Sequence, residues 1–153
     1  MVNRSISTHN PVKALSGVMV GLLLIQFVLG MYTNLYVTLP TMNAGHNGIP
    51  MGFHMMIARG FTSPVFMIHM MLGVFLVVLS LITALKSLSS TGASPKLWAG
   101  IGLVAVIVAG YSGLTFFMDG QHNIDSLTMA IAWLIALSAY FIAMTQKSSQ
   151  PTF

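Results

Sequence analysis

The chain has 153 residues, of which 56% are hydrophobic and only 5% are charged. A soluble domain carries about a quarter charged residues, so this sequence cannot cover itself with a water-soluble surface, and we expect a lipid bilayer around it. The six basic residues are too scattered to form a patch for nucleic acid, and the lack of cysteine excludes disulfides, Fe–S clusters and zinc sites with thiolate ligands.

Four segments of the chain are long and apolar enough to cross a membrane, which takes about 20 mostly apolar residues in a helix. They are residues 15–39, 64–86, 97–118 and 124–145. Because the connections are short to moderate, we predict an all-α fold, an integral-membrane antiparallel four-helix bundle. Residues 1–153 would then form a single four-span membrane domain.

The first predicted span follows a basic, polar segment and ends at Pro40. No clear small-residue cleavage site precedes Tyr32, so we interpret the span as a retained helix and not as a signal peptide. Gln26 is the main polar side chain deep in this span, where an interhelical hydrogen bond is its most common role. Gly17 and Gly21 lie four residues apart, which predicts close contact with a neighbouring helix.

The tripeptide His-Met-Met occurs twice, at residues 54–56 and 69–71. Between the two copies, Ser63 is a plausible N-cap and Pro64 a typical first helical residue, which predicts that the second span begins there. The first copy would then lie in an outer loop and the second within a membrane helix. Because successive helical residues point about 100° apart, neither tripeptide can hold one ion with all three side chains.

His69 lies about 7–8 Å inside the second span, where a polar ring must face the bundle or a cavity. Three interpretations stay open. The ring hydrogen-bonds a backbone carbonyl or the side chain of Asn34 or Tyr36, it is an axial heme ligand, or it binds copper or another metal. For a heme, His122 at the start of the fourth span, or His54, would supply a second ligand. A five-coordinate heme and a heme with methionine as the second ligand are further alternatives.

Most methionines and histidines lie in segments that the predicted topology places toward the outer side of the membrane. Thioether and imidazole groups are suitable ligands for Cu(I). The candidate copper ligands are His54, Met55, Met67 and His69. At helical spacing, Met67 pairs with Met70 or Met71. The alternative is that these methionines only pack, because methionine is an adaptable apolar side chain.

The basic residues predict the orientation of the spans. Five of the six lie on one predicted side of the membrane: Arg4, Lys13, Lys86, Lys96 and Lys147. The positive-inside rule therefore places both termini in the cytoplasm. Arg59 lies on the other side with the only two acidic residues, Asp119 and Asp125, and we expect it to pair with one of them. Asp125 and Ser126 are predicted to cap the fourth span.

Three runs of sequence resemble a group of small four-helix bacterial membrane proteins with no assigned activity: QFVLGMYTNLYVTLP (26–40), HMMLG (69–73) and SLTMAIAWLIALSAY (126–140). More distantly, the chain is similar to one four-helix half of heme A synthase. The first helix there carries a comparable Q-x-x-L-G segment, and the second carries a heme-ligating histidine within Glu-x-x-His-Arg. The resemblance to the small bacterial proteins implies a multi-pass protein of the bacterial cytoplasmic (inner) membrane. The resemblance to the synthase implies His69 as a heme ligand. Here the glutamate and arginine are missing, and the fourth-helix histidine is missing unless His122 replaces it, which makes the hydroxylation chemistry of the synthase a poor expectation.

Three functional hypotheses follow, and none of them requires an enzyme. The first is a b-type heme protein that transfers electrons near the outer face through His69 and His122. The second is a non-catalytic accessory or interaction subunit of a membrane complex, or a homo-oligomer. The third is an outward-facing copper-binding protein. All three have the lipid bilayer as a partner, and none involves nucleic acid.

Overall fold

The computed structural model describes residues 10–37, 63–90, 92–118 and 122–146. In these ranges the chain is helical and holds no strand. The helices are α1 (Pro11–Tyr36), α3 (Pro64–Leu88), α4 (Ala93–Met118) and α5 (Asn123–Thr145). Each is long and apolar enough to cross a membrane, which confirms the four predicted spans.

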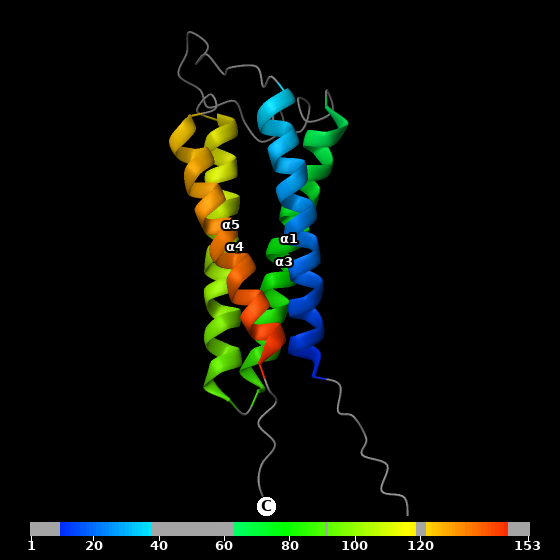
Figure 1. The fold of residues 1–153 in the computed structure, drawn as a ribbon, viewed down its shortest axis with the longest axis vertical. Coiled ribbons are helices and arrows are strands. Elements are labelled where there is room, and N and C mark those ends of the chain that lie inside the picture. Colours follow the sequence, from blue (N-terminus) through cyan, green and yellow to red (C-terminus); the bar gives the residue numbers. More distant parts are fainter. Residues whose placement is uncertain (1–9, 38–62, 91, 119–121, 147–153) are drawn as a thin grey trace, which may run out of the picture.

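The four helices form a bundle in which each one packs against two neighbours (Figure 1). α1 packs against α3 and α5, and α4 packs against the same two helices. The α4–α5 interface is the most extensive. The beginning of α1 and the end of α5 lie at the same end of the bundle, which we call the terminal end.

The start of α3 is the one that the sequence predicts. The Ser63 hydroxyl accepts a hydrogen bond from the backbone N–H of Phe66 at 3.4 Å, and Pro64 is the first helical residue. The side chain thereby satisfies one of the N–H groups that a helix start leaves without a partner. Pro40, the predicted end of the first span, lies outside the described residues, and α1 ends at Tyr36.

The predicted cap of the fourth span is wrong. α5 begins after His122, whose backbone carbonyl accepts hydrogen bonds from the N–H groups of Asp125 and Ser126. The Asp125 carboxylate accepts a hydrogen bond from the Thr115 hydroxyl of α4 at 2.9 Å. The acid therefore links two helices, whereas Arg59, its expected partner, lies outside the described part of the chain.

α3 and α4 extend beyond the predicted spans, to Leu88 and from Ala93. The sequence prediction ended the second span at residue 86 because the following residues are polar. The Ser87 hydroxyl instead donates to the backbone carbonyl of Ala84 in its own helix at 2.6 Å. Such a bond satisfies the polar side chain without ending the helix.

Small residues bring the helices together in the core. Its buried cluster comprises Met19, Leu23, Leu76, Ala105, Val106, Ala136 and Tyr140. Of the two glycines predicted to make helix contacts, Gly17 does so, because a Cβ there would lie 3.3 Å from the Met144 sulfur. A Cβ at Gly21 would meet no atom within 4 Å, so that prediction is wrong.

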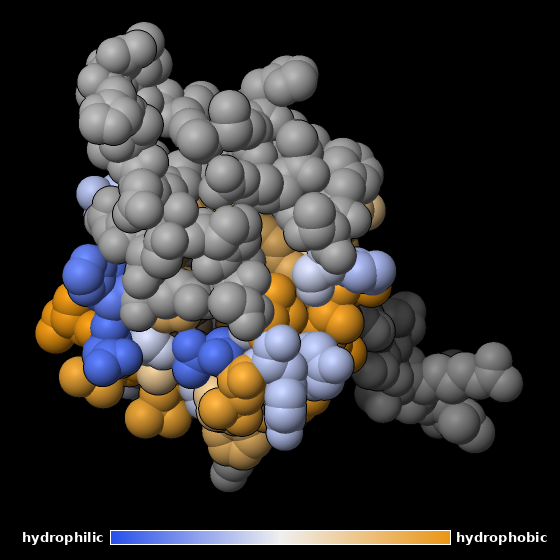
Figure 2. Space-filling view, turned by 90° about the horizontal axis from the view of Figure 1, so that it is seen from above, coloured by the Kyte–Doolittle hydropathy of each residue, from blue (hydrophilic) through white to orange (hydrophobic). Residues whose placement is uncertain are grey.

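Hydrophobic side chains cover the outside of the bundle, as lipid contact requires. Leu35, Val74 and Ile124 expose more than 60% of their surface. Figure 2 views the bundle from the end opposite the terminal end and shows orange, hydrophobic side chains around the rim. Hydrophilic side chains are also visible at this end.

Candidate functional site

The His69 side chain lies between α3 and α1. A Cβ atom at Gly30 of α1 would lie only 3.0 Å from Cε1 of the imidazole. That separation is shorter than a normal contact between carbon atoms, which is about 3.5–4.0 Å. Glycine at position 30 therefore allows the ring to lie against the α1 backbone.

Gln26 makes the interhelical hydrogen bond that its depth in the first span predicts. Its Nε2 atom donates to the backbone carbonyl of His69 at 3.0 Å. A Cβ at Gly73 would lie 3.2 Å from the same nitrogen. On each helix, a polar side chain is thus followed four residues later by a glycine that leaves room for the partner's side chain. We call these four residues, Gln26, Gly30, His69 and Gly73, the Gln26–His69 site.

Two buried polar atoms in this site lack a hydrogen-bond partner among the described residues, His69 Nδ1 and Gln26 Oε1. The imidazole also interacts with the backbone of Gln26. A hydrogen bond from the ring to a backbone group is one of the interpretations of His69 that the sequence left open. This backbone interaction still leaves Nδ1 without a partner among the described residues. Asn34 and Tyr36, the suggested side-chain partners, are exposed. Since most buried polar atoms in proteins are hydrogen-bonded, an unsatisfied imidazole nitrogen is an unusual feature.

The helix α5 contacts α1 one turn away from this site. The indole N–H of Trp133 donates to the backbone carbonyl of Leu23 at 2.8 Å. Its ring stacks on Phe27, with centroids 4.4 Å apart. α1 is therefore held to α3 by the amide of Gln26 and to α5 by the indole. Trp133 is not among the residues predicted from the sequence, although a half-buried tryptophan needs an acceptor for its N–H.

His122 lies far along the chain from this site, at the N-cap of α5. Its side chain is exposed and makes no capping hydrogen bond. The described contacts of His69, in contrast, are with Gln26 and Gly30 of α1. A pairing of the two histidines on one heme stays a prediction, and His54 lies outside the described residues.

The described part of the chain contains no group of three or more His, Cys, Asp or Glu side chains that could hold a metal ion. Met67 is 38% exposed and Met71 66% exposed, so both face outward. Met70 packs against a buried cluster of aromatic side chains, Phe66, Phe116 and Phe117. This packing favours the structural interpretation of the methionines. Met55, like His54, lies outside the described ranges.

No known protein family, curated protein or solved structure matches this chain. The resemblance to small four-helix bacterial proteins and to heme A synthase therefore stays a prediction. Function must be inferred from the Gln26–His69 site and the surfaces of the bundle.

The hydrogen bond from Gln26 can be tested by removing the amide while keeping a side chain of similar volume. We expect Gln26→Leu to lower the free energy of unfolding by about 1 kcal/mol, within the range measured for interhelical hydrogen bonds in membranes. Denaturation of the purified protein in detergent, followed by circular dichroism, would measure the change. An unchanged free energy would show that the bond to the His69 carbonyl does not stabilise the α1–α3 interface.

Proposed function

We propose that the chain is an antiparallel four-span protein of the bacterial cytoplasmic membrane with both termini in the cytoplasm. Contacts between helix ends support this topology. Thr115 near the end of α4 bonds Asp125 near the start of α5, and Phe66 at the start of α3 stacks on Phe117 at the end of α4 with centroids 5.3 Å apart. Lysines near the terminal end support the orientation: Lys13, Lys86 and Lys96.

His69 of the Gln26–His69 site would hold a b-type heme, which would let the protein transfer electrons near the outer face of the membrane. The observation that carries this proposal is the buried Nδ1 atom of His69 without a hydrogen-bond partner. An unsatisfied imidazole is costly in hydrocarbon, and a neutral imidazole is a common iron ligand. Heme would supply one-electron chemistry that the side chains of this chain lack.

The residues around His69 would hold the ligand in place. Gln26 fixes the α3 backbone at His69 through its amide. Gly30 leaves room for the ring against α1. The stacked pair of Phe27 and Trp133 adds an apolar surface one turn away, which helps to exclude water. Such fixed surroundings limit the loss of side-chain freedom on binding.

The proposal is tested by an absorption spectrum and a metal analysis of the full chain purified from heme-replete cells. We expect a Soret band with about one iron per chain in the wild-type protein, because the buried imidazole supplies the ligand. The band should be lost in His69→Ala and kept in Met67→Leu, a change at an exposed position of the same helix.

The effect of His122→Ala would decide whether His122 is the second ligand, since its loss should change the position of the band and not remove it. A folded wild-type sample without a Soret band would contradict the heme proposal. If such a sample co-purified with another membrane protein in mild detergent, the accessory-subunit hypothesis would take its place. Copper in the metal analysis would instead favour the third hypothesis.

A further inference from the structure

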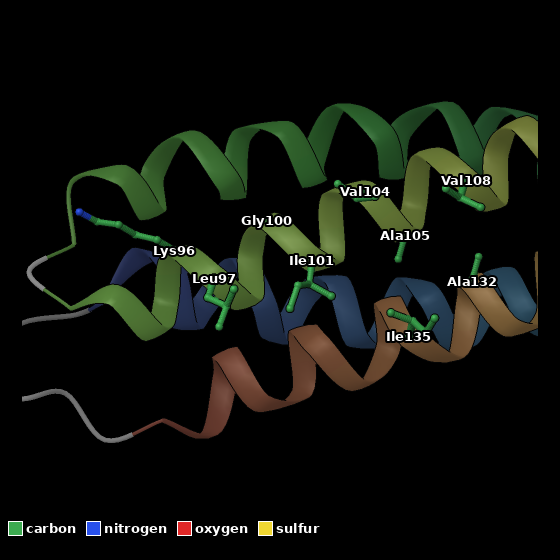
Figure 3. A pocket seen from close by; sticks show the side chains of 9 residues that line it. All are labelled: Lys96, Leu97, Gly100, Ile101, Val104, Ala105, Val108, Ala132 and Ile135. Atoms are coloured by element: carbon green, nitrogen blue, oxygen red, sulfur yellow. The ribbon is translucent and has the colours of Figure 1, made fainter.

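An apolar groove lies between α4 and α5 on the outside of the bundle (Figure 3). Its volume is about 560 Å³, within the range of roughly 300–1,000 Å³ that is typical of small-molecule sites. Small residues form its floor, namely Gly100 and Ala105 of α4 and Ala132 of α5. Apart from Lys96 at one end, every residue that lines the groove is apolar. The groove is therefore suited to a hydrocarbon chain.

The length of the groove matches one leaflet of a membrane. Along α4 the lining extends from Lys96 to Val108, a rise of about 18 Å at 1.5 Å per residue. The hydrocarbon core of a bilayer is about 30 Å thick, so the groove ends close to the midplane. A transmembrane helix of a partner would need a contact surface along most of α4, whereas a lipid acyl chain ends where this groove ends.

Lys96 adds a positive charge at the end of the groove nearest the terminal end. Figure 3 shows its side chain extending along the bundle toward that end, away from the apolar lining. Within the described ranges Asp125 is the only acidic residue, and its carboxylate bonds Thr115 near the opposite end of α4. No described carboxylate therefore neutralises Lys96. A lysine at this depth extends its ammonium group to the membrane surface, where phosphate groups lie.

We propose that this groove binds an anionic phospholipid, with one acyl chain along Gly100 and Ala105 and the headgroup phosphate near Lys96. The acyl chain fills the space that the small residues leave, and the ammonium group selects for negative charge. This site is separate from the Gln26–His69 site and does not depend on heme.

The charge part of the proposal is tested by native mass spectrometry of the delipidated full chain in detergent, titrated with phosphatidylglycerol or phosphatidylcholine. We expect phosphatidylglycerol to bind more tightly. A lysine near the membrane surface contributes about five-fold in affinity for anionic lipid. Lys96→Gln should therefore weaken the binding of phosphatidylglycerol by about five-fold and leave the binding of phosphatidylcholine unchanged. Lys86→Gln is the matched control, because Lys86 is an exposed lysine near the terminal end that does not line the groove.

The acyl-chain part is tested by filling the groove. Gly100 lines the groove, and a Cβ there would meet no atom within 4 Å. We therefore expect Gly100→Phe to place its ring in the groove. We expect both lipids to bind about ten-fold or more weakly. Gly110→Phe is the control, since a Cβ there also meets no atom and Gly110 does not line the groove.

Equal binding of the two lipids by the wild-type protein would overturn the proposal. So would Gly100→Phe binding both lipids as tightly as Gly110→Phe does, or competition by inorganic phosphate that displaces phosphatidylglycerol completely. If the protein were a dimer, and Gly100→Phe dissociated that dimer while Gly110→Phe did not, a second copy of the chain would occupy the groove instead of lipid. If Gly100→Phe fails to fold, the comparison of Lys96→Gln with Lys86→Gln decides the outcome.

Discussion

Gly102→Ala should lower the free energy of unfolding by about 3 kcal/mol, the upper part of the range for overpacking a core. A Cβ at this position would lie 2.6 Å from Cζ of Tyr140 and 2.7 Å from its Cε2. The tyrosine ring cannot move away easily, because Tyr140 is fully buried among the helices. The gain in helix propensity from glycine to alanine, about 1 kcal/mol, is smaller than the strain.

The neighbouring glycine Gly100 provides a matched control. It lies on the same helix, and a Cβ there meets no atom within 4 Å, so Gly100→Ala should leave stability unchanged or slightly increase it. Denaturation in detergent followed by circular dichroism would compare the two variants. In a Tyr140→Leu background the ring is absent, and the cost of Gly102→Ala should fall sharply. Equal stability of Gly102→Ala and Gly100→Ala would show that the ring does not lie against α4.

The four spans are predictable from sequence because hydropathy and length decide them. The start of α3 is predictable as well, since Ser63 and Pro64 act locally. The ends of the spans are less predictable. Hydropathy alone assigns Ser87 to a loop, but α3 continues through this residue, because its hydroxyl donates a hydrogen bond to a carbonyl of its own helix. Contact between helices is less predictable still. Gly17 and Gly21 lie four residues apart, a spacing that predicts helix contact for both, but of the two only Gly17 lies against another helix.

The polar residues of the candidate site were predictable from the sequence, but their contact was not. Gln26 and His69 each stood out as polar residues in apolar helices, yet their contact depends on how α1 is aligned with α3. The sequence carried a signal for that alignment, because a glycine follows each of them after four residues, at Gly30 and Gly73. Two such pairs, each with the glycine on the same helix face as the polar residue, are what reciprocal packing requires.

The methionines show the opposite case, in which the sequence pattern suggested more than the fold supports. Met67, Met70 and Met71 have spacings that permit two of them to bind one ion. The rotation of α3 instead turns Met67 and Met71 outward and Met70 toward Phe66. Rotation of a helix about its axis follows from packing against its neighbours, and an amphipathic pattern that would reveal it is weak in a helix that is apolar all round.

Gly30→Leu is expected to have a large effect on both stability and ligand binding. The first side-chain carbon alone would lie 3.0 Å from His69 Cε1, and the leucine adds three more carbon atoms. Either the imidazole must then rotate away from α1, or α1 must separate from α3. Separation of the helices would also break the hydrogen bond from Gln26 to the His69 carbonyl. We expect a loss of about 3 kcal/mol in unfolding free energy, and a heme content at least ten-fold below that of the wild type if our proposed function is correct.

The control lies on the same helix. Gly21→Leu introduces the same side chain at an exposed position, where an added Cβ would meet no atom within 4 Å. It should keep the stability of the wild-type protein and any heme. Gly30→Ala should fall between the two, because a small shift of the ring relieves a 3.0 Å contact. Stability is measured on heme-free samples, because a bound heme would itself stabilise the folded state. The two readouts then separate the packing of His69 from its proposed role as a ligand. If Gly30→Leu and Gly21→Leu were equally stable, His69 would not lie against α1, and the Gln26–His69 site would not exist as described.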